Sequence, residues 1–290
     1  MIVQCVKSIL QYEKTIDYEI IVVDNNSEDD TEQQLREIYP QLKWVQMGYN
    51  SGFAKANNAG VKVAQGEYIL YLNSDTILIE PIFEQMIAEF GHNSKTGIVG
   101  CRLLNKDKTL QLSYHYPANY FLYYTALWRR NPIGIKVFHT TDIRKKELRH
   151  IGTLHETSHT TGWITGAIMM MRRSDIEAYQ LLWDEDFFMY CEDVELCYRV
   201  RKHGFTIQYL KSPQIIHLGG GSTVLERRKA FQIQEGTLKL MDKTRGKIYR
   251  RIYVFLFKLE LRFEYWLEMR KHGEIRYDNL KYELEFYGIK

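Results

Sequence analysis

One aspartate at the end of an apolar stretch is the first candidate for chemistry. Residues 67–77 read EYILYLNSDTI, which predicts a buried strand that stops at a small polar turn carrying Asp75. Ligands of open α/β sheets gather at the carboxyl ends of strands, so Asp75 lies where a ligand would bind. A carboxylate there suits Mg²⁺ or Mn²⁺, which prefers oxygen ligands and shares its shell with phosphates. The alternative is an ordinary turn cap, because Asn and Asp are common in turns.

Two adjacent acids are the second candidate. Residues 183–201 read WDEDFFMYCEDVELCYRVR, in which an aromatic run leads into Glu192 and Asp193 at the start of a helical pattern. By default such acids are N-terminal charges that favour the helix macrodipole. In a partly dry cleft one of them could instead be a general base. His217 precedes a run of three glycines, and it is either a structural histidine or a metal or phosphate contact.

A third pattern is a spacing typical of zinc proteases. His155, Glu156 and His159 match HExxH, which binds zinc only when both histidines lie one turn apart on a helix. The surrounding Thr, Ser and Gly residues are poor helix formers. A zinc metalloprotease is therefore a remote alternative.

Alternating strands and helices would have to position these residues. Strands are expected at residues 19–24, 44–47, 67–72, 97–104, 161–173 and 205–210, and helices at residues 1–11, up to Ile38, up to Ala64, and from Pro81, Ser174 and Val194. This alternation predicts an α/β fold with a Rossmann-like, mostly parallel sheet flanked by helices. Residues 113–150 lack periodicity and are expected to form an irregular insertion with substrate-contacting loops. Trp163 is either a core residue or a platform that stacks on a sugar ring.

Composition bounds the class of protein. The chain has 290 residues, 45% of them hydrophobic, enough for one large domain or a domain with an appendage. The net charge of +3 is too small to indicate nucleic-acid binding. Four cysteines without CxxC spacing, and no signal-peptide pattern, predict a cytoplasmic, reduced protein. No apolar run reaches the roughly 18 to 20 residues of a transmembrane helix, so any membrane contact is expected to be peripheral.

The last part of the chain differs in charge. Residues 243–276 hold ten Lys or Arg and four Asp or Glu, a net charge of +6. An apolar stripe at helical spacing runs through Ile252, Phe255, Leu256, Leu259, Phe263, Trp266 and Leu267. Two interpretations stay open. The helix packs on its own domain or on a second subunit, making a homo-oligomer, or it lies on an anionic membrane surface.

The order of the motifs is more specific than any one of them. They are VVDNNSEDDT at 22–31, NSGFAKANNAG at 50–60, LYLNSDT at 70–76, TGWITGAIMMMRR at 161–173, FFMYCEDVELCYRVRKHGF at 187–205 and IIHLGGGST at 215–223. Together they resemble family 2 glycosyltransferases of the GT-A fold, most closely the rhamnosyltransferase-like branch. The resemblance implies a GT-A domain over residues 1–225, with a nucleotide-sugar half at about 1–110 and an acceptor half at about 111–225. Residues 226–290 are then a helical extension.

The resemblance also implies roles for individual residues. Asp193 matches the catalytic base, with Glu192 beside it, and Asp75 and His217 match the residues that hold a divalent cation, Mg or Mn. The nucleotide-sugar contacts that it implies are Asp24, Asn50, Gly52, Asn57, Asn73 and Asp75, and Trp163 is the candidate acceptor or sugar contact. The DxD element of the family is here Asn73, Ser74 and Asp75, which leaves one carboxylate for the metal.

The implied activity is an inverting, metal-dependent hexosyl transfer. The donor would be a nucleoside-diphosphate sugar, with rhamnose suggested by the branch, and the acceptor a hydroxyl of a cell-surface glycan or lipid-linked molecule at the inner face of the cell membrane. Relatives begin with an apolar strand before the first helix, whereas residues 1–11 here have a helical pattern. We therefore expect the first strand to be missing, which should expose sheet edges. A catalytically impaired nucleotide-sugar-binding module is the alternative.

Overall fold

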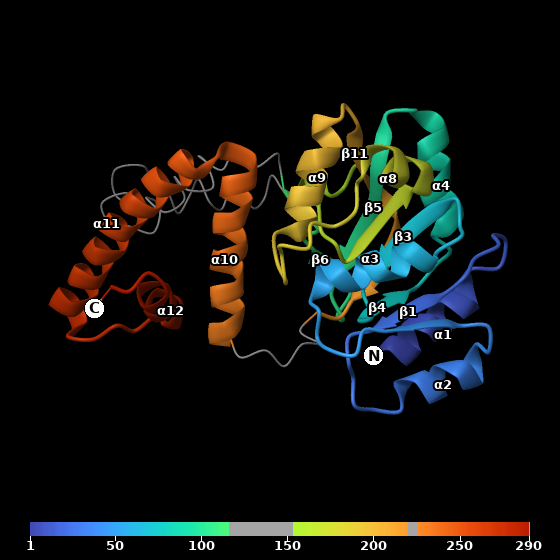
Figure 1. Cartoon of the computed structure of the whole chain (residues 1–290), viewed down its shortest axis with the longest axis horizontal. Helices are drawn as coiled ribbons and strands as arrows, with labels where there is room; N and C mark the ends of the chain where they lie inside the picture. The colour runs from blue at the N-terminus through green and yellow to red at the C-terminus, as the bar shows by residue number, and fades with distance from the viewer. Residues whose placement is uncertain (116–152, 220–225, 290) are drawn as a thin grey trace. The chain divides into compact units, whose positions relative to one another are not determined.

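The computed structural model describes residues 1–115, 153–219 and 226–289. The chain divides into two compact units (Figure 1). The first unit comprises Met1–Pro117, Ile151–Phe188 and Glu192–Ser222, and the second comprises Ala118–His150, Met189–Cys191 and Thr223–Lys290. Each unit has a hydrophobic core of its own.

The first unit alternates helices and strands. Its elements are α1 (Ile2–Tyr12), β1 (Ile21–Asp24), α2 (Thr31–Ile38), β2 (Lys43–Gln46), α3 (Phe53–Val63), β3 (Tyr68–Leu72), β4 (Thr76–Leu78), α4 (Phe83–His92), β5 (Thr96–Leu104), β6 (Leu110–Gln111), β7 (Tyr114–His115), β8 (His159–Thr161), β9 (Trp163–Ile164), β10 (Ile168–Arg172), α8 (Arg173–Tyr179), α9 (Glu192–Lys202) and β11 (Thr206–His217). Most of the expected elements are present, with boundaries shifted by a few residues. The one strand expected at residues 161–173 is instead divided into β9 and β10, which pair with different strands. The structure adds short strands, such as β4, that no periodic pattern indicated.

The central sheet is mixed. Its strands follow the order β3-β10-β5-β11-β4, with β6 on β5 and β8 on β11. Only β5 and β11 pair in parallel in this sheet, as far as the described residues go. The expectation of a mostly parallel sheet is therefore wrong. Strands β3 and β5 do share one direction, but β10, which is distant in sequence, pairs antiparallel with both. Periodicity identifies strands and does not reveal such an insertion.

A second, two-stranded sheet carries Asp24. Strands β1 and β2 pair in parallel, with Asp24 opposite Gln46. In the part of the chain that the structure describes, β1 pairs with β2 alone and β3 pairs with β10 alone. Each of β1 and β3 therefore has one edge without a strand partner, which is the kind of exposed edge expected from the sequence.

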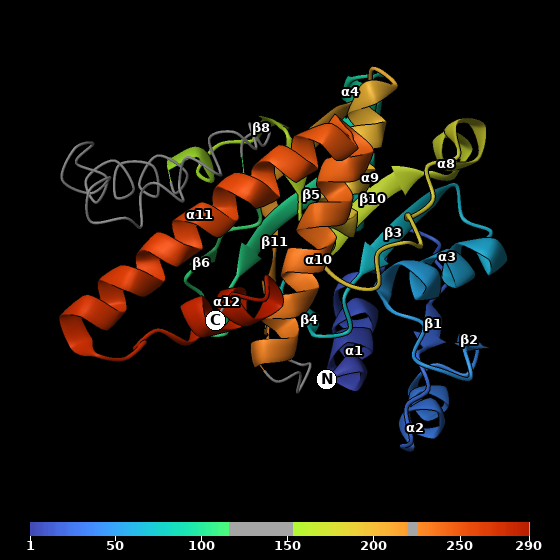
Figure 2. The same cartoon turned by 60° about the vertical axis from the view of Figure 1, so that its left-hand side comes forward.

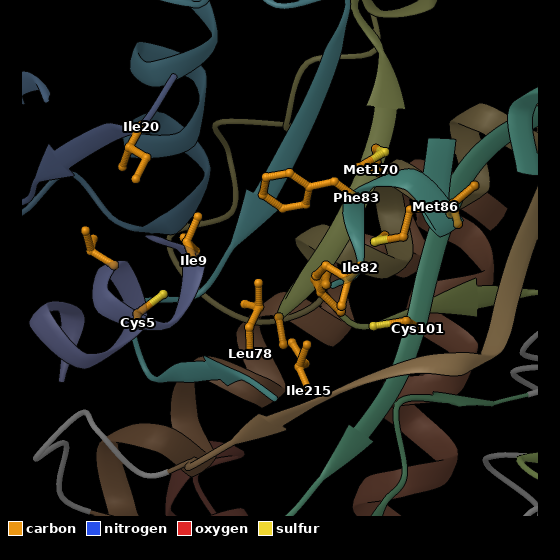
Figure 3. Close-up of a cluster of buried hydrophobic side chains, with 14 of the residues drawn as sticks. Cys5, Ile9, Ile20, Leu78, Ile82, Phe83, Met86, Cys101, Met170 and Ile215 are labelled. Atoms are coloured by element: carbon orange, nitrogen blue, oxygen red, sulfur yellow. The ribbon is translucent and has the colours of Figure 1, made fainter. Parts of the chain in front are cut away.

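One hydrophobic core joins the small sheet to the large one. Cys5 and Ile9 of α1 pack in the same cluster as Ile20, which directly precedes β1 (Figure 3). The cluster continues to Met86 of α4 and Ile215 of β11. A second cluster, built around the fully buried Trp183, includes residues of α8 and α9. Helices thus cover the sheet, as the α/β class requires.

The start of α4 and the end of β11 differ from the boundaries expected from the sequence. Helix α4 begins at Phe83 after the N-cap Ile82, and not at Pro81. The buried carboxylate of Glu13 accepts hydrogen bonds from the amides of Ile82 and Phe83, so a side chain distant in sequence caps the helix. Strand β11 continues past residue 210, through an irregularity between Leu210 and Gln214, to His217.

Residues 226–289 of the second unit are mainly helical (Figure 2). They form α10 (Glu226–Arg245), α11 (Lys247–His272) and α12 (Asp278–Phe286). The core of the unit consists of Phe257, Leu261, Leu280, Leu284 and Tyr287. None of the helices within the described ranges is long and apolar enough to cross a membrane.

Candidate active site

Asp75 and His217 lie together at the end of the central sheet. Asp75 Oδ1 is 3.2 Å from His217 Nε2, and the two side chains are 14% and 17% exposed. The antiparallel register of β4 and β11 brings them together, because it sets His217 opposite Thr76. The hydrogen bond to His217 holds the pKa of Asp75 below its ordinary value, although burial opposes this. Asp75 is therefore a carboxylate at neutral pH.

Gln111 of β6 orients the imidazole of His217. Gln111 Oε1 lies 2.7 Å from His217 Nδ1, and its amide nitrogen donates to the His217 carbonyl oxygen and to Asn105 Oδ1. Nδ1 therefore donates its proton to Gln111 Oε1, and Nε2 is the ring nitrogen that faces Asp75. A histidine that binds a metal through Nε2 is commonly oriented in this way, by a hydrogen bond from Nδ1. No sequence pattern indicated Gln111, because β6 is only two residues long.

Asn73 completes this side of the site. Its amide nitrogen Nδ2 is 3.5 Å from His217 Nε2. Among the residues that the structure describes, no three His, Cys, Asp or Glu side chains gather around a metal position. A carboxylate, an imidazole and a side-chain amide still fit a divalent cation that completes its shell with diphosphate oxygens and water. The residues present are thus compatible with Mg²⁺ or Mn²⁺.

Glu192 and Asp193 stand in the first turn of α9 in different environments. Glu192 is 6% exposed, and its Oε2 has no hydrogen-bond partner within the described structure. Burial, together with the neighbouring Asp193 charge, raises the pKa of Glu192 to about 8. Burial also raises the pKa of Asp193, but Asp193 accepts hydrogen bonds from the amides of Gly166 and Val194 at 3.2 and 2.8 Å. These hydrogen bonds favour the charged form of Asp193, so Asp193 is better placed than Glu192 to carry the negative charge of the pair.

A single dipeptide connects the two acidic sites. The backbone amide of Gly166 donates to Asp193 Oδ2. The backbone carbonyl of Ala167 accepts from the backbone amide of Asn73 at 3.0 Å. Gly166 and Ala167 are adjacent in the connection between β9 and β10. The candidate base and the candidate metal residues are therefore held in one hydrogen-bonded framework.

The other predicted residues cluster around the end of β1. Asp24 is buried, and both its carboxylate oxygens accept from the amide of Ser27, at 3.0 and 3.1 Å. Asn25 accepts from the amide and hydroxyl of Ser51, and its Nδ2 donates to the Gly52 carbonyl. Asn25 thus ties the loop after β1 to the turn before α3. The sequence analysis did not select Asn25.

Gly52 is required by its backbone and by its neighbour. Its φ is 83°, and a Cβ there would lie 2.5 Å from the carbonyl oxygen of Phe188. The Phe53 amide donates to that same oxygen at 2.8 Å, and Asn50 Oδ1 accepts from the Gly52 amide at 3.3 Å. The turn before α3 is therefore joined directly to the segment that leads toward Glu192.

Two neighbouring asparagines of α3, Asn57 and Asn58, differ in their hydrogen-bond partners. The Asn57 amide group donates to the Phe53 carbonyl of its own helix at 2.9 Å. Asn58 is fully buried, and it donates to the Trp183 carbonyl and accepts from the Trp183 amide, both at 2.9 Å. Asn58 was missed because a buried structural asparagine and a ligand contact look alike in sequence.

Trp163 belongs to β9 and is half-buried, packed against the cluster around Trp183. Strand β9 pairs with β7, with Trp163 opposite His115. The core interpretation therefore accounts for Trp163 in part, since the residue is only partly exposed.

The zinc-protease alternative is wrong. His155 is fully buried, where its Nε2 accepts from the Ser113 amide at 3.3 Å, and His159 belongs to strand β8. Glu156 pairs instead with Arg102 at 2.8 Å. The two histidines do not lie one turn apart on a helix, because the segment turns and then joins the sheet through β8.

Comparison with known proteins identifies the family of the chain. The family model described as Glycosyl transferase family 2 matches residues 1–179. The chain is 26% identical over 220 residues to the O-antigen biosynthesis protein RfbC of Myxococcus xanthus, covering 73% of this chain and 16% of that protein. It is 24% identical over 224 residues to the N-acetylglucosaminyl-diphospho-decaprenol L-rhamnosyltransferase of Mycobacterium tuberculosis, covering 70% of this chain and 67% of that enzyme.

Solved structures support the fold. One is GalNAc-T7 with UDP, GalNAc and Mn²⁺, at a TM-score of 0.55 and 13% identity, covering 82% of this chain and 44% of that one. Another is TarS residues 1–349 of S. aureus, at a TM-score of 0.50 and 14% identity, covering 84% and 68%. The GT-A fold expected from the motifs is confirmed. The chain belongs to glycosyl transferase family 2.

Proposed function

We propose that this glycosyltransferase moves a sugar, with inversion at the anomeric carbon, from a nucleoside-diphosphate sugar to a hydroxyl of a lipid-linked or cell-surface glycan. The observation that carries the proposal is the Gly166–Ala167 link, which holds Asp193 and the Asn73–Asp75 turn in one framework. The name of the mycobacterial relative specifies rhamnose and a decaprenol-linked acceptor. We extend that acceptor class, with rhamnose as the sugar, to this chain. Such an acceptor would require work at the inner face of the cell membrane.

In this mechanism Asp193 takes the proton from the acceptor hydroxyl. The hydroxyl oxygen then forms a bond to the anomeric carbon as the bond from that carbon to the donor phosphate oxygen breaks, and the nucleoside diphosphate leaves with the electron pair. Glu192 stays protonated near neutral pH, so the negative charge of the pair remains on Asp193. Asp75 and His217 would hold the divalent cation, which supplies charge neutralisation for the diphosphate when bound.

The remaining residues are assigned to binding. The proposed nucleotide-sugar contacts are Asp24, Asn50, Gly52, Asn57 and Asn73. Asn57 can serve this way only if its amide leaves the Phe53 carbonyl, to which it donates at 2.9 Å. Trp163 is the proposed contact for the acceptor or the sugar.

The test compares Asp193→Asn with Glu192→Gln. Asp193→Asn removes the proton acceptor, so transfer should fall by about 10² or more while nucleoside-diphosphate binding persists. Glu192→Gln keeps a neutral side chain of the same size and should lower transfer far less. Transfer rates and binding constants measured on both variants check this. Full transfer by Asp193→Asn together with a dead Glu192→Gln would assign the base to Glu192.

A catalytically impaired nucleotide-sugar-binding module is the second candidate. It is favoured by the separation of β1 and β2, which carry Asp24, from the central sheet. Donor hydrolysis or sugar transfer by the unaltered protein with Mn²⁺ separates the two candidates. Nucleotide binding without any turnover would support the module.

A further inference from the structure

Helix α11 has an apolar face that its own unit leaves exposed. On its inner side Phe257 and Leu261 are almost fully buried in the core of the second unit. A different side carries large apolar residues that are between 46 and 74% exposed, namely Ile248, Ile252, Phe255, Leu256, Leu259 and Trp266. Folding of the unit therefore uses one apolar side of α11 and leaves this second one, here called the outer stripe, in contact with solvent.

The outer stripe is one continuous surface. Its members follow one another at steps of mostly three and four residues, which places them on one side of a helix. From Ile248 to Trp266 the stripe is about 27 Å long, at roughly 1.5 Å per residue. The rings of Phe263 and Trp266 stack at 5.9 Å between centroids near its carboxyl end. A contiguous exposed surface of this kind marks an interaction site more often than scattered apolar residues do.

Cations border the outer stripe. Lys247, Arg251, Lys258 and Arg262 recur along one flank of it at steps of four and seven, and the Arg270 guanidinium lies 5.1 Å from the Trp266 ring centroid. None of these five forms an ion pair with another described residue. Arg250, by contrast, is paired with Asp242 at 2.8 Å. The cations beside the stripe are therefore available to an external anion.

This charge pattern distinguishes between two possible partners of the outer stripe, a second copy of the chain and an anionic lipid surface. If two copies of α11 paired antiparallel about a twofold axis, the same flank of each helix would meet, and its cations would repel one another. An anionic lipid surface is complementary to both the apolar stripe and its cations. Apolar side chains enter the boundary between headgroups and acyl chains, while Lys and Arg contact phosphates. A Trp ring is suited to the same interface. We propose that the outer stripe docks the protein on the surface of an anionic phospholipid bilayer.

The proposal goes beyond sugar transfer, and its test does not depend on activity. The full chain is sedimented with vesicles of phosphatidylcholine alone and with vesicles that also contain phosphatidylglycerol, at low and high salt. We expect binding to the anionic vesicles at low salt, weaker binding at high salt, and little binding to the neutral ones. Equal recovery in the supernatant with both kinds of vesicle would overturn the proposal.

Variants separate the two parts of the surface. Arg251→Gln with Arg262→Gln should weaken binding to anionic vesicles by roughly 30-fold, since each cation near such a surface contributes on the order of fivefold. Ile252→Glu with Phe255→Glu should abolish it. Both pairs are solvent-exposed, so melting temperatures should stay unchanged. Val63→Glu, at an exposed apolar residue of α3, is the matched control and should bind like the unaltered protein.

Analytical ultracentrifugation of the same variants tests the alternative that a second copy of the chain covers the outer stripe. A dimer that Ile252→Glu with Phe255→Glu dissociates, in a protein that does not bind anionic vesicles, would assign the outer stripe to a second copy. A monomer that binds anionic vesicles through these residues supports the proposal. Binding that survives both double substitutions would place the membrane contact elsewhere and overturn it.

Discussion

At the scale of single residues, the neighbours Glu192 and Asp193 show how position separates two like groups. Both begin α9, but only Asp193 receives hydrogen bonds from backbone amides, whereas Glu192 is buried without a partner for Oε2 among the described residues. Hydrogen bonds favour the charged form of a carboxyl and burial disfavours it. The macrodipole interpretation is therefore incomplete, since one of the two acids is neutral at pH 7.

The raised pKa of Glu192 predicts a pH-dependent stability. The folded protein keeps this proton up to about pH 8, whereas the unfolded chain releases it near its ordinary pKa. Between these values the folded state binds more protons, so this group makes the free energy of unfolding fall as the pH rises. Glu192→Gln should therefore gain stability over the unaltered protein from about pH 5 to 8. Urea unfolding at pH 5, 7 and 9 checks this, and a pH-independent difference would contradict it.

The pair Asp75 and His217 predicts a link between cation and nucleotide. Asp75→Ala should remove the additional rise in melting temperature that Mn²⁺ gives in the presence of a nucleoside diphosphate, while the ligand-free protein stays folded. Gln111→Leu leaves both proposed ligands in place but releases His217 Nδ1. It should weaken the apparent Mn²⁺ affinity by about 10- to 100-fold. Unchanged Mn²⁺ dependence in Asp75→Ala would remove Asp75 from the proposed metal site.

At the scale of elements, the turn before α3 supports the segment before α9. A Cβ at Gly52 would meet both the backbone oxygen and the ring of Phe188, at 2.5 and 2.8 Å. Gly48 also has a positive φ, but a Cβ there would meet nothing within 4 Å. The two glycines therefore separate the cost of backbone conformation from the cost of the contact.

Gly48→Ala should destabilise the protein by about 1 kcal/mol, the conformational cost alone. Gly52→Ala should cost at least about 2 kcal/mol more, since it must also displace the Phe188 backbone, and it should reduce transfer. Chemical denaturation and transfer rates measured on both variants check this. Equal losses would mean that the approach of Phe188 is not needed.

At the scale of the whole molecule, the two sheets share one core without sharing a strand. Ile20 and Val22, at β1, pack in the same cluster as Leu70 and Leu72 of β3, yet no described strand pairs with both β1 and β3. Unpaired strand edges promote association of chains, so this part of the molecule is the expected origin of aggregation.

An added strand should pair with the unpaired edges of β1 and β3. An apolar extension of five residues, the length of β3, joined to Met1 by a short turn, should raise the melting temperature and reduce aggregation on heating. The matched control is the same extension with two prolines, which cannot complete the backbone hydrogen bonds. Thermal unfolding with light scattering compares them. Equal melting temperatures for both extended proteins would show that the edges do not accept a strand.

The sequence alone determined the elements and the candidate chemistry. Helical and strand periodicities are local, so α1, α2, β3, β5 and α9 were expected close to where they lie. Motif order sufficed to predict the family, which the match over residues 1–179 then showed. The apolar stripe of α11 could also be predicted, because residues spaced three and four apart lie on one face of a helix.

Only the tertiary structure decided which of these residues meet. The insertion of β10 between β3 and β5, the support of His217 by Gln111, and the link from Asn73 to Ala167 join residues far apart in sequence. The difference in surroundings between Glu192 and Asp193 depends on the Gly166 amide, which donates to Asp193. Such pairings follow from strand register and burial, which depend on the whole core and leave no local periodicity to detect.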